Sequence, residues 1–426
     1  MAAGDRADLV LVNAGQLVTV AGSSGAPKRG DDLASIGVIE DGAVAVRGGR
    51  ITAVGTTREV LERVETGPST KILDAAGLVV LPGLVDPHTH LVFAGSREDE
   101  FVLKIQGASY LEILKDGGGI LSTVRAVRSA SKERLYHSAR KNLDVMLCQG
   151  TTTAEVKSGY GLTTADELKM LEVIDDLNRS HPVDLAPTFL GAHAVPLEYK
   201  DNLEGYLSLI MDEMLPAAAG RGLAEFCDVF CEEGVFSVGQ SRQILQAAIE
   251  LGLKPKIHAD EIVSLGGAEL AAAVGAVSAD HLMAVSDEGV RVLARSGTVA
   301  VLLPATTFCL MSGRYAPARK MIGEGVAVAL ASDFNPGSCP VNSLQVVMGI
   351  ACRQLKMTPA EVISAATINA AHAIGRGHYI GSIEAGKKAD LVVFDAPSYN
   401  YLPYCFGTNL VKTVVKNGEI VVGGQM

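Results

Sequence analysis

Several features that mark common classes of protein are missing from this sequence. No stretch of 18 uninterrupted apolar residues occurs, so a membrane-spanning helix is not expected. Lysine and arginine form no run and the net charge is −11, which argues against a nucleic-acid interface because such an interface needs a basic face. The first residues, MAAGDRADLVLVNAG, are acidic where a signal peptide needs a basic start. We therefore expect a cytoplasmic protein with neither a nucleic-acid nor a membrane partner.

Cysteine and phosphate-loop motifs are also lacking. The seven cysteines are an odd number, are widely spread and form no CxxC motif, which disfavours a disulfide scaffold and a structural zinc knot. The glycine-rich stretch DGGGI at residues 116–120 is no phosphate loop, because no GK[ST] follows it and no GxGxxG occurs. What is left is a globular chain of 426 residues with 48% apolar content, long enough for one large domain and an appendage.

The two ends of the chain share a pattern of short strands and turns. Residues 7–80, and again residues from about 380 onward, read as short strands separated by glycines and polar turns. Residues 24–36 are rich in Gly, Pro and Asp and read as a surface loop. We predict that residues 1–80 and 378–426 pair into one small β-sandwich domain.

Residues 81–377 alternate apolar runs with helical patterns. Residues 164–177 begin with a capping box formed by Thr164 and Glu167, and residues 132–147 repeat apolar side chains at helical spacing. The strand-like runs number eight: residues 78–86, 151–156, 185–191, 226–231, 254–258, 276–280, 299–305 and 326–333. They are uniformly apolar, as strands covered on both faces are. The predicted fold class is therefore α/β, a (β/α)8 TIM barrel carrying the small sandwich.

Polar residues gather where these strands end. The active site of such a barrel lies at the carboxyl ends of its strands. Five of the nine histidines follow a predicted strand: His88, His90, His193, His258 and His281. Of the other four, His137 is expected on a helix surface, His181 and His378 in polar connections, and His372 as a packed helix residue.

Four of these polar side chains predict a metal site. His88 and His90 stand at positions i and i+2 of a strand, so both point to the same side. A lone HxH would be weak evidence, but His258 follows the fifth strand and Asp333 ends the eighth. Three nitrogens and one oxygen suit Zn²⁺ or Fe²⁺ with one position open for water.

The sequence also resembles a known family. PGLVDPHTH after a β-rich start, GSIEAGKKADLVV near the end and the aspartate of the eighth strand resemble the amidohydrolase superfamily. GLVDPHTHLVFAGSRE, EVKSGYGL, FLGAHAVP, DVFCEEGVFS, HADE, SADHL and ASDFNPGSCP, in this order, resemble the imidazolonepropionase family within it. The resemblance implies ring opening of 4-imidazolone-5-propanoate to N-formimidoyl-L-glutamate, the third step of histidine degradation. It also implies a homodimer.

The resemblance bears on the number of metal ions as well. Two-metal members of the superfamily use a carboxylated lysine from the fourth strand, and FCDVFC has no lysine, while Lys157 belongs to the second strand. A single divalent metal is therefore expected. The chain departs from the bacterial pattern at Ser338, where threonine is frequent, and at Lys104, where arginine is common. Neither position touches the expected metal ligands.

Three residues are expected to carry the chemistry. Glu261, three residues after His258, would take a proton from water or substrate and return it to the ring nitrogen. His281 would stabilise the oxyanion, and Asp333 would bind metal and shuttle a proton. The competing interpretations make Glu261 an acid at a helix start and His281 a buried structural histidine.

The propionate tail of the substrate requires a cation. Arg97 follows the HxH pair by seven residues, in the first β/α loop, where a bidentate grip is possible; otherwise it is a solvated arginine. The resemblance carries over a set of substrate contacts that also includes Glu261: Tyr110, Tyr160, His193, Asn335, Gly337 and Ser338. Gly337 otherwise completes a turn after Pro336.

Two other functions stay open at this point. A deaminase acting on a cyclic amidine would use the same attack chemistry, although a neutral nucleobase needs no cation such as Arg97. A non-catalytic scaffold would retain the fold without the function, because a fold does not fix a function. All the expected site residues are present, which disfavours that alternative.

Overall fold

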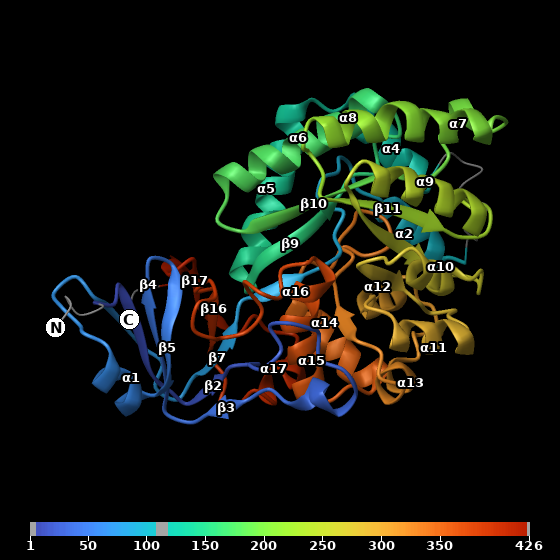
Figure 1. Ribbon diagram of the computed structural model, residues 1–426. Helices are drawn as coiled ribbons and strands as arrows, with labels where there is room; N and C mark the ends of the chain where they lie inside the picture. The colour runs from blue at the N-terminus through green and yellow to red at the C-terminus, as the bar shows by residue number, and fades with distance from the viewer. Residues whose placement is uncertain (1–5, 108–117, 424–426) are drawn as a thin grey trace.

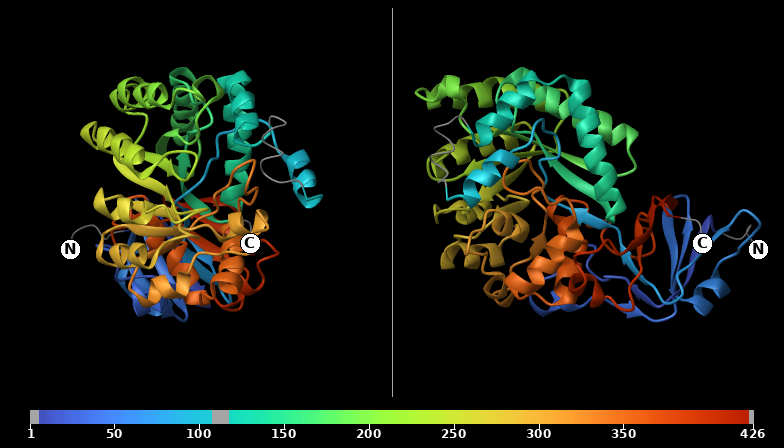
Figure 2. Two further views of the ribbon diagram at one scale, coloured as in Figure 1. Left: turned by 90° about the vertical axis from the view of Figure 1, so that its right-hand side faces the viewer. Right: turned by 180° about the vertical axis from the view of Figure 1, so that it is seen from behind.

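The barrel and the strands of the two chain ends form separate sheets of one structure. The computed structural model describes residues 6–107 and 118–423. Figure 1 shows the helix-covered barrel beside the small sheets, and Figure 2 shows the same arrangement from two further sides. None of the helices described is long and apolar enough to cross a membrane.

Eight parallel strands form the barrel in chain order. They are β8 (Leu84–Asp86), β9 (Thr151–Lys157), β10 (Asp184–Ala192), β11 (Phe226–Cys231), β12 (Lys254–Ala259), β13 (Ser278–His281), β14 (Val299–Leu302) and β15 (Val328–Leu330). Past β8 and β15 the chain closes the ring: Asp333 N donates to His88 O at 3.0 Å, and His90 N donates to Phe334 O at 2.9 Å. The predicted TIM barrel is confirmed, with each predicted apolar run contributing one strand.

Helices cover the outside of the barrel between the strands. Those of the first half are α2 (Glu98–Ile105), α4 (Ile120–Ser129), α5 (Lys132–Cys148), α6 (Thr164–Ser180), α7 (Leu203–Leu209), α8 (Leu215–Gly220) and α9 (Val238–Glu250). Those of the second half are α10 (Gly267–Ala273), α11 (Asp287–Arg295), α12 (Pro304–Cys309), α13 (Ala318–Gly323), α14 (Leu344–Ile350), α15 (Pro359–Ala365) and α16 (Ile368–Ala373). The helical period predicted for α5 holds, since Leu135, Ala139 and Leu143 are buried.

The start of α6 differs from the prediction. Thr163, not Thr164, is the N-cap, and its side chain accepts a hydrogen bond from Asp166 N at 3.2 Å. Glu167 lies one position too far along to complete that box. Its carboxylate instead turns inward and accepts hydrogen bonds from three backbone N–H groups of the preceding loop.

The small sheets together form the predicted sandwich. One sheet holds β5 (Arg50–Thr56), β4 (Gly42–Arg47), β1 (Leu9–Ala14) and β6 (Lys71–Asp74). The other joins both chain ends in the order β18 (Glu419–Val422), β17 (Val411–Lys416), β16 (Leu391–Phe394), β7 (Val79–Pro82), β2 (Gln16–Val18) and β3 (Val38–Ile39). Their facing side chains, among them Leu11, Val44, Val80, Leu391 and Val415, share one apolar core. The division at residues 80 and 378 stays a prediction.

One apolar run of the sequence serves two sheets. Residues 78–86 are predicted as one barrel strand, but β7 pairs with β16 of the sandwich and only β8 enters the barrel. Gly83 separates the two, and a Cβ atom built on it would lie 2.1 Å from Thr152 Oγ1. Only glycine therefore fits this crossing from one sheet to the next.

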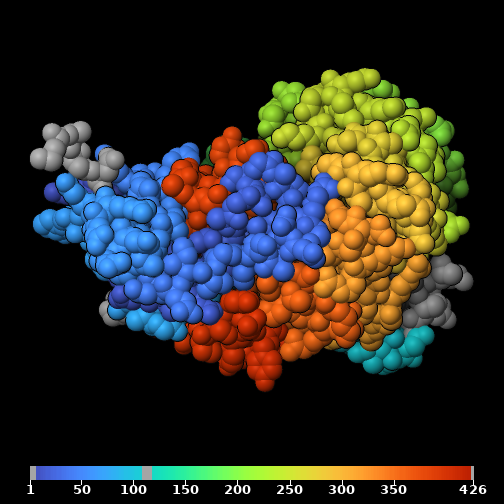
Figure 3. Space-filling view, turned by 60° about the horizontal axis from the view of Figure 1, so that its bottom comes forward, coloured from blue at the N-terminus to red at the C-terminus, as the bar shows by residue number. Residues whose placement is uncertain are grey.

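Polar contacts join the sandwich to the barrel. Asp184 at the start of β10 forms ion pairs with Lys388 and Lys416, whose Nζ atoms both lie 2.7 Å from Asp184 Oδ2. The segment at residues 24–36, predicted as a surface loop, contains a 3-10 helix, Gly30–Ala34, that buries Leu33 in the barrel core. Arg29 anchors this segment to the barrel, its Nη1 donating to Ala294 O at 2.8 Å. Figure 3 shows the N-terminal segment in blue lying against the orange part of the barrel.

Candidate active site

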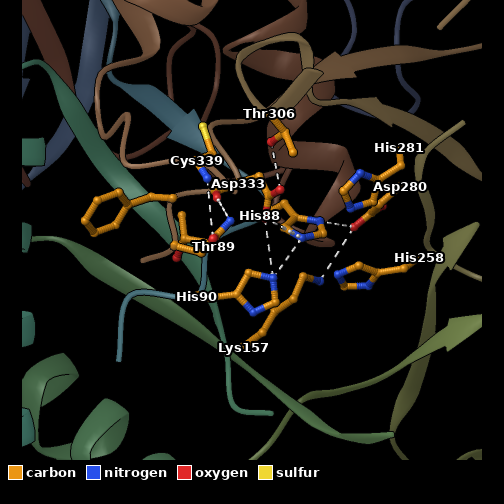
Figure 4. Close-up of polar contacts among 12 residues, drawn as sticks. His88, Thr89, His90, Lys157, His258, Asp280, His281, Thr306, Asp333 and Cys339 are labelled. Atoms are coloured by element: carbon orange, nitrogen blue, oxygen red, sulfur yellow. Dashed lines mark hydrogen bonds and ion pairs between the residues drawn. The ribbon is translucent and has the colours of Figure 1, made fainter. Parts of the chain in front are cut away.

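Three of the four predicted ligands converge at the closure of the barrel. His88 Nε2 and His90 Nε2 lie 3.4 Å apart, and each lies 3.5 Å from Asp333 Oδ1 (Figure 4). Thr306 on α12 holds the other oxygen of Asp333, donating to Oδ2 at 2.7 Å. All three predicted ligands are almost completely buried.

These spacings fit a tetrahedral metal. Zinc lies about 2.0–2.1 Å from nitrogen and oxygen ligands, so two ligand atoms of a tetrahedral site are roughly 3.4 Å apart. Burial lowers the pKa of both histidines, which keeps them neutral. Neutral imidazole is the form that binds a metal. The residues present therefore fit a divalent cation.

The fourth predicted ligand, His258, lies beside this group. Its ring centroid is 4.6 Å from that of His88, and its Nε2 is buried without a hydrogen-bond partner. Three groups of side chains able to hold a metal occur among the described residues, and all of them draw on this one site. The structure brings His88, His90 and Asp333 together and places His258 next to them, with a buried nitrogen that lacks a partner.

The expected acid–base pair lies on the neighbouring strand ends. Glu261 Oε1 is 3.7 Å from His281 Nδ1, which has no hydrogen-bond partner. Burial, and then the charge of Asp333, raise the pKa of Glu261 to about 8. His281 and Asp333 both have positive φ, 77° and 54°, a conformation that costs energy and concentrates at functional sites. Glu261 is thus a carboxyl group able to exchange a proton near neutral pH.

Two buried acids hold the loop that carries Glu261. Asp260 accepts backbone hydrogen bonds from Leu265, Gly266, Gly267 and Ala268, so its role is structural. Glu232 accepts from Ile262 N at 2.8 Å. Glu261 itself makes none of these contacts among the described residues, which leaves its carboxylate available to the site.

Arg97 reaches the same mouth from the first β/α loop. It is the N-cap residue of α2, and its Nε donates to Glu100 Oε2 at 2.9 Å. A Cβ atom built on Gly337 would lie 1.9 Å from Arg97 Nη1, so the guanidinium packs directly on that glycine. The side chain of Arg97 is 13% exposed, which contradicts the alternative of a solvated arginine.

Tyr160 and His193 form the wall next to His90. The ring of His193 stacks on that of His90 with centroids 4.8 Å apart, and Tyr160 lies 5.3 Å from His193. His193 Nδ1 donates to Gly159 O at 3.0 Å, and burial lowers the pKa of His193 to about 3. The other nitrogen of this neutral ring is thus a hydrogen-bond acceptor.

The loop after β15 is shaped by Asn335. Its Oδ1 accepts from Gly337 N at 2.9 Å and Ser338 N at 2.7 Å, while its Nδ2 donates to Asp333 O at 2.6 Å and to Ser338 Oγ at 2.8 Å. The amide of Asn335 is therefore engaged within the loop. Tyr110, the remaining expected contact, lies outside the described residues.

Sequence reasoning missed the charged interior below the site. Six acidic and lysine side chains on the barrel strands are completely buried: Asp86, Glu155, Lys157, Asp228, Lys256 and Asp280. Lys157 is the last residue of β9 and lies inside the barrel rather than in the loop after it. The signal was the spacing i, i+2 of Glu155 and Lys157 within an otherwise apolar run.

Sequence comparison connects the chain to characterised families. The profile of the amidohydrolase family matches residues 79–421, and that of an imidazolonepropionase-like composite domain of bacteria matches residues 42–63. Imidazolonepropionase from Alkaliphilus metalliredigens (strain QYMF) is 55% identical over 97% of this chain and 98% of its own. Imidazolonepropionase from Alkaliphilus oremlandii (strain OhILAs) is 57% identical over the same shares.

Solved structures share the fold at much lower identity. An adenosine deaminase from Xanthomonas campestris with bound zinc superposes with a TM-score of 0.72 at 20% identity, covering 99% of this chain and 94% of its own. E. coli guanine deaminase gives a TM-score of 0.72 at 15% identity, covering 98% of this chain and 99% of its own. At this identity the likeness concerns the fold alone.

Proposed function

The chain belongs to the amidohydrolase family and, within it, to the imidazolonepropionases, and from this premise we propose how its own residues perform the reaction. It is a hydrolase that acts on a carbon–nitrogen bond of a cyclic amide. The substrate is 4-imidazolone-5-propanoate, and the product is N-formimidoyl-L-glutamate. The convergence of His88, His90 and Asp333 within 3.5 Å is the observation that carries the proposal.

The metal is a single divalent ion, Zn²⁺ or Fe²⁺, with His88, His90, His258 and Asp333 as its ligands. When bound, it would polarise the ring carbonyl and lower the pKa of a water from 15.7 to roughly 7. A second ion bridged by a carboxylated lysine is disfavoured, because carboxylation needs a neutral amine. Lys157, the lysine of β9, is an ammonium held between carboxylates.

Glu261 transfers the proton, and His281 stabilises the negative charge that develops on the carbonyl oxygen. Water adds to the ring carbonyl carbon and loses a proton to Glu261, and His281 donates a hydrogen bond to the oxygen that becomes negative. The carbon–nitrogen bond then breaks, and Glu261 returns the proton to the leaving nitrogen. The pKa of about 8 supports this double role, since a carboxyl group with such a pKa both accepts and donates near neutral pH.

Arg97 holds the propionate tail, and Tyr160, His193, Asn335, Gly337 and Ser338 surround the substrate. Within the described ranges Arg97 donates a hydrogen bond through Nε to Glu100, and its two Nη groups would bind the two oxygens of a carboxylate. Asn335 acts by fixing the loop of Gly337 and Ser338, because its amide is engaged there. The deaminase alternative has only distant structural relatives in its favour.

The test combines metal analysis with loss of the ring absorbance of freshly prepared substrate. Glu261→Gln should lower kcat by about 10²–10⁴-fold while the metal content stays at one ion per chain. Glu233→Gln, which changes an exposed glutamate of a neighbouring loop, is the matched control and should retain full activity. Full activity of Glu261→Gln, or of enzyme stripped of metal, would contradict the proposal, and release of ammonia would favour a deaminase.

A further inference from the structure

The buried lysine beneath the site contacts three carboxylates at once. Lys157 Nζ lies 2.8 Å from Glu155 Oε1, 2.7 Å from Asp228 Oδ2 and 3.6 Å from Asp280 Oδ2. Burial alone would lower the pKa of Lys157, but the charges of Asp228, Glu155 and Asp280 raise it, so the group is an ammonium. The reaction as proposed makes no use of this residue.

Two of these carboxylates each face a histidine of the site with the same oxygen that faces the lysine. Asp280 Oδ2 lies 2.6 Å from His88 Nδ1 (Figure 4). Asp228 Oδ2 lies 3.0 Å from His258 Nδ1, and its Oδ1 accepts the backbone N–H of His258 at 3.1 Å. The ammonium of Lys157 thus contacts one oxygen of Asp228 and one of Asp280, and each of these oxygens also faces Nδ1 of a different histidine.

We propose that Lys157 is a positioning residue that fixes Asp228 and Asp280, and through them the orientation of His258 and His88 toward the metal. The inference rests on the proposed function of these two histidines as ligands. Each aspartate faces the Nδ1 side of its imidazole, which leaves Nε2 on the opposite side of the ring for a metal. Lys157, in contact with both carboxylates, holds them in place.

A second buried lysine provides the comparison. Lys256 is equally buried and contacts Glu155 Oε2 at 2.9 Å, yet its other contacts are the backbone oxygens of Pro87 and Ala373. It acts on Asp280 through space, lowering the pKa of that group against the effect of burial. Lys256 therefore matches Lys157 in charge, burial and partner Glu155, and differs in having no contact to Asp228 or Asp280 among the described residues.

A purely electrostatic effect of Lys157 and a positioning role of Lys157 predict opposite changes in metal affinity when the residue is removed. Removing a cation near a metal site reduces repulsion and would tighten metal binding, whichever lysine is removed. Removing the residue that holds the two aspartates would loosen the histidines and weaken metal binding, and loss of such outer partners typically costs 10–100-fold in affinity. The two explanations are thus separated by the sign of the change.

The experiment uses charge-matched pairs in the full-length protein. Lys157→Met alone would leave three carboxylates facing one lysine and would test folding as much as binding. We therefore compare Glu155→Gln/Lys157→Met with Glu155→Gln/Lys256→Met, both against Glu155→Gln. Zn²⁺ affinity is measured by competition with a chromophoric chelator, and ligand geometry by the visible absorption of bound Co²⁺. Circular dichroism and thermal unfolding of the metal-free proteins report folding.

We expect Glu155→Gln/Lys157→Met to bind Zn²⁺ about 10–100-fold more weakly than Glu155→Gln and to change the Co²⁺ spectrum. The Lys256 pair should stay within about threefold, with an unchanged spectrum. Equal effects of the two pairs, or tighter binding after loss of Lys157, overturn the inference while the wild type still binds metal. A wild type that binds no Zn²⁺ overturns the proposed function itself.

Discussion

Arg97 offers the sharpest test of how the substrate is recognised. Its Nε is taken by Glu100, so a carboxylate would be bound through the two Nη groups. Two charge-assisted hydrogen bonds contribute about 1.5–3 kcal/mol each, and the 13% exposure of the side chain reduces this by some solvent screening. Removing the guanidinium should then cost about 3–4 kcal/mol of binding, or roughly 100–700-fold in KM, at 1.4 kcal/mol per tenfold.

The effect should fall mainly on KM. The tail does not react, so its contact to Arg97 contributes about equally in the ground state and the transition state. Arg97→Ala should therefore raise KM by that factor and change kcat far less, as measured by loss of ring absorbance at varied substrate concentration. Arg97→Lys keeps a charge but loses the bidentate geometry, so its KM should lie between that of the wild type and that of Arg97→Ala.

Two controls separate this grip from a general effect of charge. Lys141→Ala removes an exposed cation of α5 and should change KM less than about threefold, as screened surface charges do. An imidazolone without the propionate tail should be hydrolysed equally by the wild type and by Arg97→Ala. An unchanged KM for Arg97→Ala, or an equal loss with the tail-less compound, would refute the reasoning.

Two further predictions concern the fold. Leu143→Ala should lower the free energy of unfolding, measured by denaturant titration, by about 2–5 kcal/mol, because this side chain of α5 is completely buried. Leu61→Ala, at an exposed position, should have little effect in the same titration. Despite burial, Lys416 and Lys388 hold the pKa of Asp184 below 3.8, so its stabilising contribution is present above that pH and is lost as pH falls through the lowered pKa. The difference in Tm between the wild type and Asp184→Asn should accordingly shrink from about pH 6 to about pH 3, and a constant difference would contradict this.

The barrel was predictable because its strands are buried on both faces. Such strands read as short, uniformly apolar runs, and each of the eight runs contributed one. The mistake at residues 78–86 has the same origin, since an apolar run does not tell which sheet it joins. β7 lies between β2 and β16, of which β16 is more than 300 residues away, and only the Pro82–Gly83 step marks the crossing. Pairing over such a distance has no local signal.

The histidines of the site were predictable for a geometric reason. The period of a strand places His88 and His90 on one side, and the parallel strands bring all the polar strand ends to one mouth. The cap of α6 was misassigned because Thr163 and Thr164 both suit the position. The loop ahead of the helix decides between them, because its backbone N–H groups donate hydrogen bonds to Glu167. A competing tertiary contact of this kind is invisible in a capping motif.

The pairing of the buried charges could not be derived from the sequence, although it bears directly on the expected metal ligands. Barrel interiors are usually filled by layers of branched apolar side chains, and a buried charge is stable only when it is paired. Here Glu155, Asp228 and Asp280 are paired with Lys157 and Lys256. Asp228 and Asp280 also face His258 and His88, so the pairing continues into the expected metal ligands. These contacts connect β9, β11, β12 and β13, and no spacing within one strand indicates which charges meet across the barrel.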